Sequence, residues 1–290
     1  MFQGSLVALV TPMSESGDLD FAALERLVEF HVAAGTHGLV AAGTTGEAIT
    51  LTDEEYESLL RRTLGLVAGR IPVLAGSGSS CTRTTIALSR LAERCGVDGC
   101  LIATPAYNKP MQSGLLQHYQ AVASAVDLPI ILYNVPGRTA CDMTAETVCT
   151  LSRISNIVGI KEATGSIERG IEILDGAESD FVLLSGDDPT AVSLMEAGAK
   201  GVISVTANVA PTAMAKLCNA ALAGDFATAK ELDSGLRSLH QVLFIESNPI
   251  PTKWALSKMG LISNGIRLPL TPLSEAHHGQ VESVIANAGV

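Results

Sequence analysis

Residues 156–166 read NIVGIKEATGS, an apolar run in which a single lysine, Lys161, stands near the carboxyl end. The run is continuously apolar instead of alternating, which is typical of a parallel strand covered on both faces. Seven further segments of this kind recur along the chain, and their starts lie roughly 20 to 34 residues apart. They are SLVALVTP (5–12), HGLVAAGTTGE (37–47), IPVLAGSG (71–78), GCLIATPAYN (99–108), PIILYNVP (129–136), FVLLSGDD (181–188) and GVISVTAN (201–208).

The intervals between these segments carry helical periodicity, as in FAALERLVEFHVAAG (21–35) and TRTTIALSRLAERCG (82–96). Eight strand–helix units in succession predict an α/β fold, a (β/α)8 TIM barrel with right-handed crossovers. A doubly wound parallel sheet is the alternative that the periodicity leaves open. The residues after the eighth segment read as helices over 211–224, 225–244, 250–260 and 274–289. We therefore predict a catalytic barrel domain over residues 1–224 and a C-terminal helical extension over residues 225–290.

The overall composition excludes several classes of function. The chain has 290 residues, 47% of them hydrophobic, and a net charge of −11, without a basic run that would bind nucleic acid. No apolar run approaches the roughly 18 residues of a membrane span. The first residues lack the positive region of a signal peptide, so we expect a cytoplasmic protein without membrane or nucleic-acid partners.

Metal and cofactor motifs are also missing from the sequence. The six cysteines form no CxxC pair, and we expect them to be reduced core residues; Cys81 precedes a predicted helix but has no evident base nearby. The histidines show no ligand spacing. The glycine-rich stretch GSGSSC (76–81) lacks both the third glycine of a dinucleotide loop and the lysine of a P-loop. We therefore predict no metal and no organic cofactor.

In a barrel of this kind the chemistry lies at the carboxyl ends of the strands. Strand alternation would place Ile157, Gly159 and Lys161 on one face, with Glu162 pointing the opposite way. The polar residues at the predicted strand ends are Thr44, Thr45, Glu47, Tyr107, Tyr133, Arg138, Lys161, Glu162, Asp187 and Asp188.

Lys161 is the residue of this set with the most specific chemistry. A lysine at a strand end is ordinarily a surface charge that snorkels to water. Burial in an apolar lumen would instead lower its pKa and make the amine a nucleophile toward carbonyl carbon, giving a Schiff base. That chemistry needs proton transfer, and Tyr133 on the neighbouring strand is a suitable donor and acceptor. Alone, Tyr133 would read as an ordinary strand tyrosine.

The remaining motifs favour carboxylate substrates. The turn GTTGE (43–47) offers backbone N–H groups and two hydroxyls to a small anion, and Arg138 could grip a carboxylate. Asp187 and Asp188 stand where many barrels bind phosphate, which argues for a non-phosphorylated substrate. Capping of the following helix is an equally valid interpretation of these two residues.

Four motifs, GTTGE (43–47), YNVPGRT (133–139), GIKEATG (159–165) and LSGDD (184–188), resemble in this order those of the dihydrodipicolinate synthase family of lysine biosynthesis. The resemblance extends to GSLVALVTPM (4–13) and NPIPTKWA (248–255). It implies that Lys161 forms a Schiff base with pyruvate, whose enamine then attacks L-aspartate 4-semialdehyde to give 4-hydroxy-tetrahydrodipicolinate.

The resemblance also implies roles for the other site residues. Tyr133 would shuttle protons, linked through Thr44 to a Tyr107 supplied by a neighbouring subunit. Thr45 would hold the pyruvate carboxylate and Arg138 that of the semialdehyde. Gly186 and Ile203 would complete the substrate site. The family implies a homotetramer built from two tight dimers and no cofactor or metal.

Six residues depart from the lysine-inhibited bacterial type of this family, which carries serine, two histidines, asparagine, glutamate and tyrosine at the corresponding positions. They are Ala48, Asp53, Tyr56, Ser80, Thr84 and Ala106. We therefore predict an enzyme that is insensitive to lysine. Two alternatives stay open: a sialic acid or keto-deoxy-sugar pyruvate lyase of the same superfamily, which Arg138 disfavours, and a non-catalytic barrel that binds small molecules.

Overall fold

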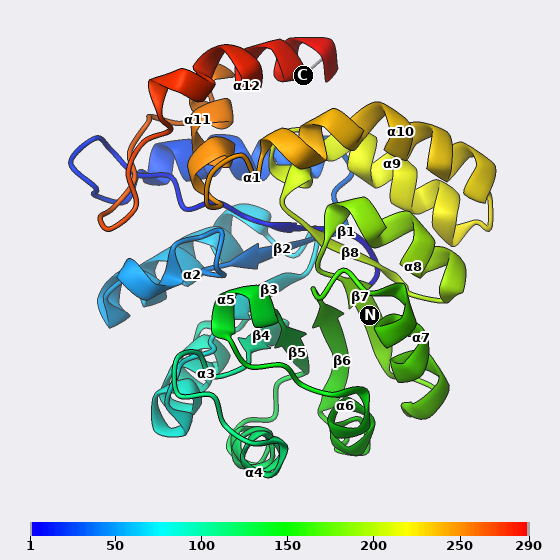
Figure 1. The fold of residues 1–290 in the computed structure, drawn as a ribbon. Helices are drawn as coiled ribbons and strands as arrows, with labels where there is room; N and C mark the ends of the chain where they lie inside the picture. Colours follow the sequence, from blue (N-terminus) through cyan, green and yellow to red (C-terminus); the bar gives the residue numbers. More distant parts are fainter. Residues whose placement is uncertain (1, 289–290) are drawn as a thin grey trace.

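The computed structural model describes residues 2–288 and confirms the TIM barrel. Eight parallel strands close into a barrel in chain order, with β1 paired to both β2 and β8 (Figure 1). The strands are β1 (Gly4–Ala8), β2 (Gly38–Ala41), β3 (Val73–Gly76), β4 (Gly99–Ala103), β5 (Ile130–Asn134), β6 (Ile157–Glu162), β7 (Val182–Ser185) and β8 (Gly201–Ser204). Each of the eight predicted segments coincides with one of these strands, although β1 begins one residue before its segment.

Helices surround the barrel and extend beyond it at the carboxyl end of the chain (Figure 1). They are α1 (Phe21–Ala33), α2 (Asp53–Val67), α3 (Thr82–Cys95), α4 (Gln112–Ala123), α5 (Pro136–Thr139), α6 (Ala145–Leu151), α7 (Ile167–Gly176), α8 (Ala191–Ala197), α9 (Pro211–Leu222), α10 (Phe226–Val242), α11 (Ile250–Lys258) and α12 (Glu275–Ala288). Three 3-10 turns follow strands: η1 (Ala48–Thr50), η2 (Asp188–Thr190) and η3 (Thr206–Asn208). Capping residues mark the start of several helices. At α2, for example, Thr52 and Glu55 form a reciprocal capping box.

The strands separate two apolar clusters. The larger cluster packs the outer faces of the strands against the helices. The smaller one fills the lumen, and its buried members include Leu6, Leu74, Ile131, Leu184 and Ile203. Each strand thus divides its side chains between lumen and helices, as alternation requires.

Strand β6 departs from simple alternation at its start. Its pairing with β5 shifts by one residue, because Ile130 pairs with Ile157 and Ile131 with Gly159. Ile157 consequently packs in the outer cluster, while the half-buried Val158 packs against the lumenal one. The prediction that Ile157 shares a face with Lys161 is therefore wrong, because sequence alternation cannot reveal a bulge.

The C-terminal helices cover one side of the barrel and reach its functional end (Figure 1). The domain boundary predicted at residue 224 falls in the turn between α9 and α10. Lys253 of α11 forms a buried ion pair with Glu47, which follows β2. This contact joins the C-terminal helices to the turn that bears Thr44 and Thr45. Among the helices of residues 2–288, none is long and apolar enough to cross a membrane.

Candidate active site

Lys161 and Tyr133 lie side by side in the lumen of the barrel. They are register partners on β6 and β5, and the ammonium Nζ of Lys161 lies 4.4 Å from the centroid of the Tyr133 ring. Lys161 also pairs with Leu184, a lumenal residue of β7. Register partners in parallel strands point to the same side of a sheet, so Lys161 faces the lumen. Glu162 points the other way and accepts hydrogen bonds from Asn134 Nδ2 (3.1 Å) and the Thr164 N–H (2.7 Å).

Burial changes the acidity of both lumenal groups. Lys161 is only 5% exposed, and loss of hydration lowers its pKa to about 8, with Asp188 opposing this shift and Arg138 adding to it. Burial raises the pKa of Tyr133 to about 12, although Arg138 and the Thr44 hydroxyl both favour its ionised form. At neutral pH a substantial fraction of Lys161 is therefore a neutral amine, while Tyr133 keeps its proton.

Gly186 and Ile203 border the lysine. A Cβ atom at Gly186 would lie 3.0 Å from both Cε and Cγ of Lys161 and 2.6 Å from the Cβ of Ala163. Any larger residue would push against the lysine stem. Ile203 on β8 is 1% exposed and belongs to the lumenal cluster that contains Tyr133. These two residues therefore pack near the lysine at the carboxyl ends of β7 and β8.

Thr45 and Arg138 are connected through Asn248, a residue for which the sequence alone suggested no role. Thr45 is 2% exposed, and its Oγ1 accepts a hydrogen bond from Asn248 Nδ2 (2.8 Å). Arg138 Nη2 donates to the backbone carbonyl of Asn248 (3.2 Å). The motif NPIPTKWA contributed to the family resemblance, but nothing in the sequence pairs it with residues so far upstream.

Thr44 and Tyr107 lie in the turns that follow the carboxyl ends of β2 and β4. Thr44 is exposed beside the Tyr133 hydroxyl. Tyr107 has a positive φ of 74° and is 94% exposed, so its ring makes little contact within its own chain. The structure thus brings Lys161, Tyr133, Thr44 and Gly186 together, but leaves the Tyr107 ring away from them.

The two aspartates after β7 do not cap the helix that follows them with their side chains. The Oδ2 atom of Asp187 accepts a hydrogen bond from the Thr190 hydroxyl (2.9 Å). The Oδ2 atom of Asp188 instead accepts from the backbone N–H groups of Val205 and Thr206 (3.0 Å each), at the start of η3. Asp188 therefore ties the end of β7 to the end of β8.

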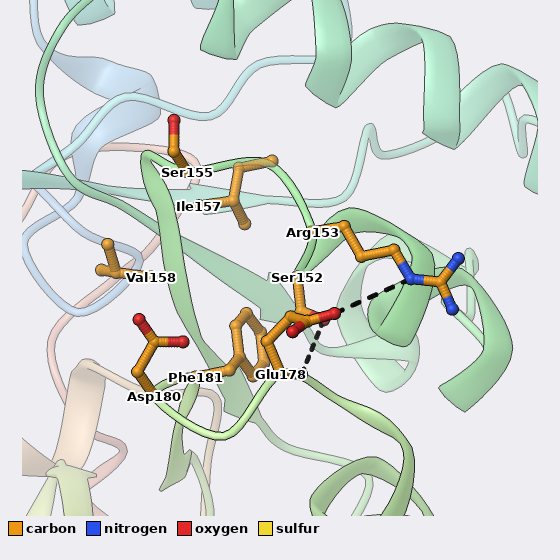
Figure 2. Close-up of a pocket in the computed structure, with 8 residues that line it drawn as sticks. All are labelled: Ser152, Arg153, Ser155, Ile157, Val158, Glu178, Asp180 and Phe181. Atoms are coloured by element: carbon orange, nitrogen blue, oxygen red, sulfur yellow. Dashed lines mark hydrogen bonds and ion pairs between the residues drawn. The ribbon is translucent and has the colours of Figure 1, made fainter.

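No group of three histidine, cysteine, aspartate or glutamate side chains within residues 2–288 is arranged to hold a metal ion. A cavity of about 470 Å³ lies at the amino ends of β6 and β7, opposite Lys161. Figure 2 shows its rim, where Arg153 and Glu178 are paired (3.9 Å) and Asp180 lies close by. The chemistry described above belongs to the other end of the barrel.

Comparison with known proteins places this geometry in context. The model of the dihydrodipicolinate synthetase family matches residues 1–288. The chain is 57% identical, over its whole length and 99% of the relative, to the 4-hydroxy-tetrahydrodipicolinate synthase of Pseudomonas syringae. It is 56% identical, with the same coverage, to that of Alcanivorax borkumensis. Among solved structures, the chloride-inhibited dihydrodipicolinate synthase of Acinetobacter baumannii, complexed with pyruvate, superposes with a TM-score of 0.99, 50% identity and full coverage of both chains.

Proposed function

The chain belongs to the dihydrodipicolinate synthetase family, and from this premise we propose that it condenses pyruvate with L-aspartate 4-semialdehyde to give 4-hydroxy-tetrahydrodipicolinate. The observation that carries the proposal is the pairing of a buried Lys161 with Tyr133 in an apolar lumen. The names of the curated relatives support an enzyme of the lysine and diaminopimelate route. We further propose that it acts in the cytoplasm.

The first half-reaction follows from the acidity of Lys161. Its neutral Nζ attacks the C2 carbonyl carbon of pyruvate, and water leaves as the imine forms. The protonated imine withdraws electrons, so the methyl group loses a proton and an enamine results. Tyr133 carries protons in these steps, because its ring lies 4.4 Å from the Lys161 nitrogen and its hydroxyl keeps its proton at neutral pH. Thr45, fixed by Asn248, holds the pyruvate carboxylate.

The second half-reaction uses the aldehyde. The enamine carbon attacks the aldehyde carbon of the semialdehyde and forms a carbon–carbon bond. This regenerates the imine on Lys161, and the aldehyde oxygen takes up a proton to become the 4-hydroxyl group. The substrate amine then attacks the imine carbon, which closes the ring and releases Lys161 as the free amine. Arg138 binds the carboxylate of the semialdehyde, because its guanidinium lies at the open end of the site and is oriented by the Asn248 carbonyl.

A second copy of the chain completes the site in this proposal. Tyr107 is 94% exposed, and its neighbour Met111 is 77% exposed, so one chain alone leaves large apolar side chains in water. We propose that Tyr107 enters the site of a partner subunit and joins Thr44 and Tyr133 in proton transfer. The assembly would be a homotetramer of two tight dimers.

We also propose that physiological lysine does not inhibit this enzyme. Asp53, Ser80 and Thr84 lie on the surface near the start of α2 and α3, and none supplies the glutamate of the inhibited bacterial type. Tyr56 differs from the other five departures because it is buried in the outer cluster (3% exposed). Its contribution is to packing, not to a surface binding site.

Borohydride reduction in the presence of pyruvate tests the proposed function. An imine is reduced to a stable secondary amine, so mass mapping should find the adduct on Lys161. Lys253 provides an internal comparison, because it is equally buried but is held by Glu47 in an ion pair. An adduct on Lys253, or turnover by Lys161→Ala, would refute the mechanism.

A further inference from the structure

Asp188 is a buried carboxylate with one oxygen left unpaired. The residue is 3% exposed, and its Oδ2 accepts two backbone hydrogen bonds, from Val205 and Thr206. Its Oδ1 is also buried, yet no hydrogen-bond donor reaches it within residues 2–288. Buried carboxylate oxygens are ordinarily satisfied, because leaving one unpaired in a low-dielectric site is costly. Asp188 Oδ1 therefore remains free to interact with a positive charge that forms during the reaction.

Lys161 is a cation on which the charge of this carboxylate acts, although the two side chains, both within residues 2–288, form no direct ion pair. The turn after β7 packs directly on the lysine stem, since a Cβ at Gly186 would lie 3.0 Å from its Cε and Cγ. Asp188 follows Gly186 by two residues. Its charge acts on Lys161 in the direction that favours the protonated amine, whereas Arg138 acts in the opposite direction. The site thus contains one anion and one cation with opposite effects on the same nitrogen.

Building on the proposed Schiff-base function, we propose that Asp188 is a positioning residue that acts through Lys161 as the fixed counter-ion of the imine nitrogen. The protonated imine carries a positive charge at the buried position of Lys161, where water solvates it poorly. A carboxylate fixed in place by two N–H groups stabilises that charge without having to reorganise. A protonated imine withdraws electrons more strongly than a neutral one. By keeping the imine protonated, the Asp188 carboxylate promotes loss of the methyl proton of pyruvate.

Other ionisable groups surround the pair on every side. Tyr133 and Arg138 approach from β5 and α5, and Asp187 precedes Asp188 in the same turn. Cys218 on α9 is buried and its pKa is raised to about 12, by burial first and by the Asp188 charge second. On α10, His240 Nδ1 lies 2.7 Å from the Thr206 hydroxyl, next to the N–H group that binds Asp188. Removing the charge of Asp188 can therefore change the ionisation of these neighbours as well as that of Lys161.

The substitution Asp188→Asn tests the proposal. The amide keeps an oxygen that accepts from Val205 and Thr206, but it removes the charge. Borohydride trapping of pyruvate, measured against pH, should show its midpoint moved to lower pH by about half a unit to one unit, because the protonated amine loses its stabilising anion. Exchange of the pyruvate methyl protons in heavy water, followed by NMR, should slow by roughly tenfold or more at neutral pH.

Asp187→Asn is the matched control, because its carboxylate bonds to Thr190 and should leave both measurements unchanged. If Asp188→Asn does not fold, Asp188→Ser replaces it with the same expectation, since a hydroxyl still accepts from the N–H groups. An unchanged trapping midpoint in the charge-free variant overturns the role of Asp188. Absence of any Lys161 adduct in the unmodified enzyme would instead overturn the proposed function itself.

Discussion

The side-chain amide of Asn248 donates a hydrogen bond to the hydroxyl of Thr45 over 2.8 Å, although 203 residues separate them in the sequence. The backbone carbonyl of Asn248 accepts from Arg138 over 3.2 Å. One residue of the C-terminal helical region thus orients the two groups that we propose to bind the two substrate carboxylates. If Thr45 and Arg138 bind substrate as proposed, the C-terminal extension helps to build the site as well as to cover the barrel.

Replacing Asn248 with alanine should weaken pyruvate binding. Thr45 would lose the donor that fixes its hydroxyl, and a hydrogen bond of this kind contributes about 0.5–1.5 kcal/mol. We expect kcat/KM for pyruvate to fall roughly three- to tenfold, mainly through KM. Steady-state kinetics measure this, with Asn264→Ala, an exposed asparagine of the same region, as control. A wild-type KM in Asn248→Ala would show that Thr45 does not need this partner.

The pH dependence of imine formation should follow the acidity of Lys161. Burial lowers its pKa to about 8, so the neutral amine is lost as pH falls through 8 and gained as pH rises through it. At pH 7 roughly a tenth of the lysine is neutral, against less than a thousandth for an unperturbed lysine of pKa about 10.4. The initial rate of borohydride-trapped adduct should therefore have its midpoint near pH 8. A midpoint near 10 would mean that the lysine is hydrated in solution.

The substitution Tyr133→Phe should distinguish the contribution of the Tyr133 hydroxyl from that of its ring. Phenylalanine keeps the aromatic contact with Lys161, seen at 4.4 Å, but cannot transfer a proton. General acid–base catalysis contributes typically 10²–10⁴-fold, so we expect kcat to fall by that order while the fold is retained. Tyr119→Phe is the control, because within residues 2–288 that buried hydroxyl bonds to the Ile102 carbonyl and to no group of the proposed site. Similar losses in both variants would point to a general packing defect.

Arg138→Ala should impair use of the semialdehyde far more than imine formation. A charge-assisted pair typically contributes about 1.5–3 kcal/mol, which corresponds to roughly a ten- to hundredfold rise in KM for the aldehyde. Single-turnover trapping with pyruvate alone isolates the first half-reaction and should change little. Equal damage to both half-reactions would assign Arg138 to the pyruvate site or to the turn formed by α5.

The fold and the lumenal pair were predictable from sequence because both depend on short-range patterns. Continuous apolar strands at regular spacing indicate a barrel, and alternation puts Tyr133 and Lys161 on comparable faces of adjacent strands. The bulge at Ile157 was not predictable, because a continuously apolar run gives no sign of where the pairing register shifts. Asn248 and the unpaired oxygen of Asp188 were missed for another reason: their significance lies in contacts between distant turns, which local periodicity does not encode.

The last prediction concerns inhibition by lysine. A lysine ligand carries two ammonium groups and needs at least one well-placed anion, and the inhibited bacterial type has a glutamate where this chain has Thr84. Loss of one charge-assisted partner costs on the order of 1.5–3 kcal/mol, so two such losses would raise a submillimolar dissociation constant to tens of millimolar or more. Asp53 is exposed, and an exposed ion pair restores only about 0–1 kcal/mol.

We therefore expect no half-inhibition below about 10 mM lysine, which is a binding free energy weaker than about −3 kcal/mol. A coupled assay at saturating substrates, with lysine titrated at constant ionic strength, measures this. Thr84→Glu is the informative variant, because it returns the anion at the exposed first turn of α3 and should lower the half-inhibition concentration roughly tenfold. Half-inhibition of the unmodified enzyme at or below about 1 mM would contradict the argument, because it requires about −4 kcal/mol from a surface without that glutamate.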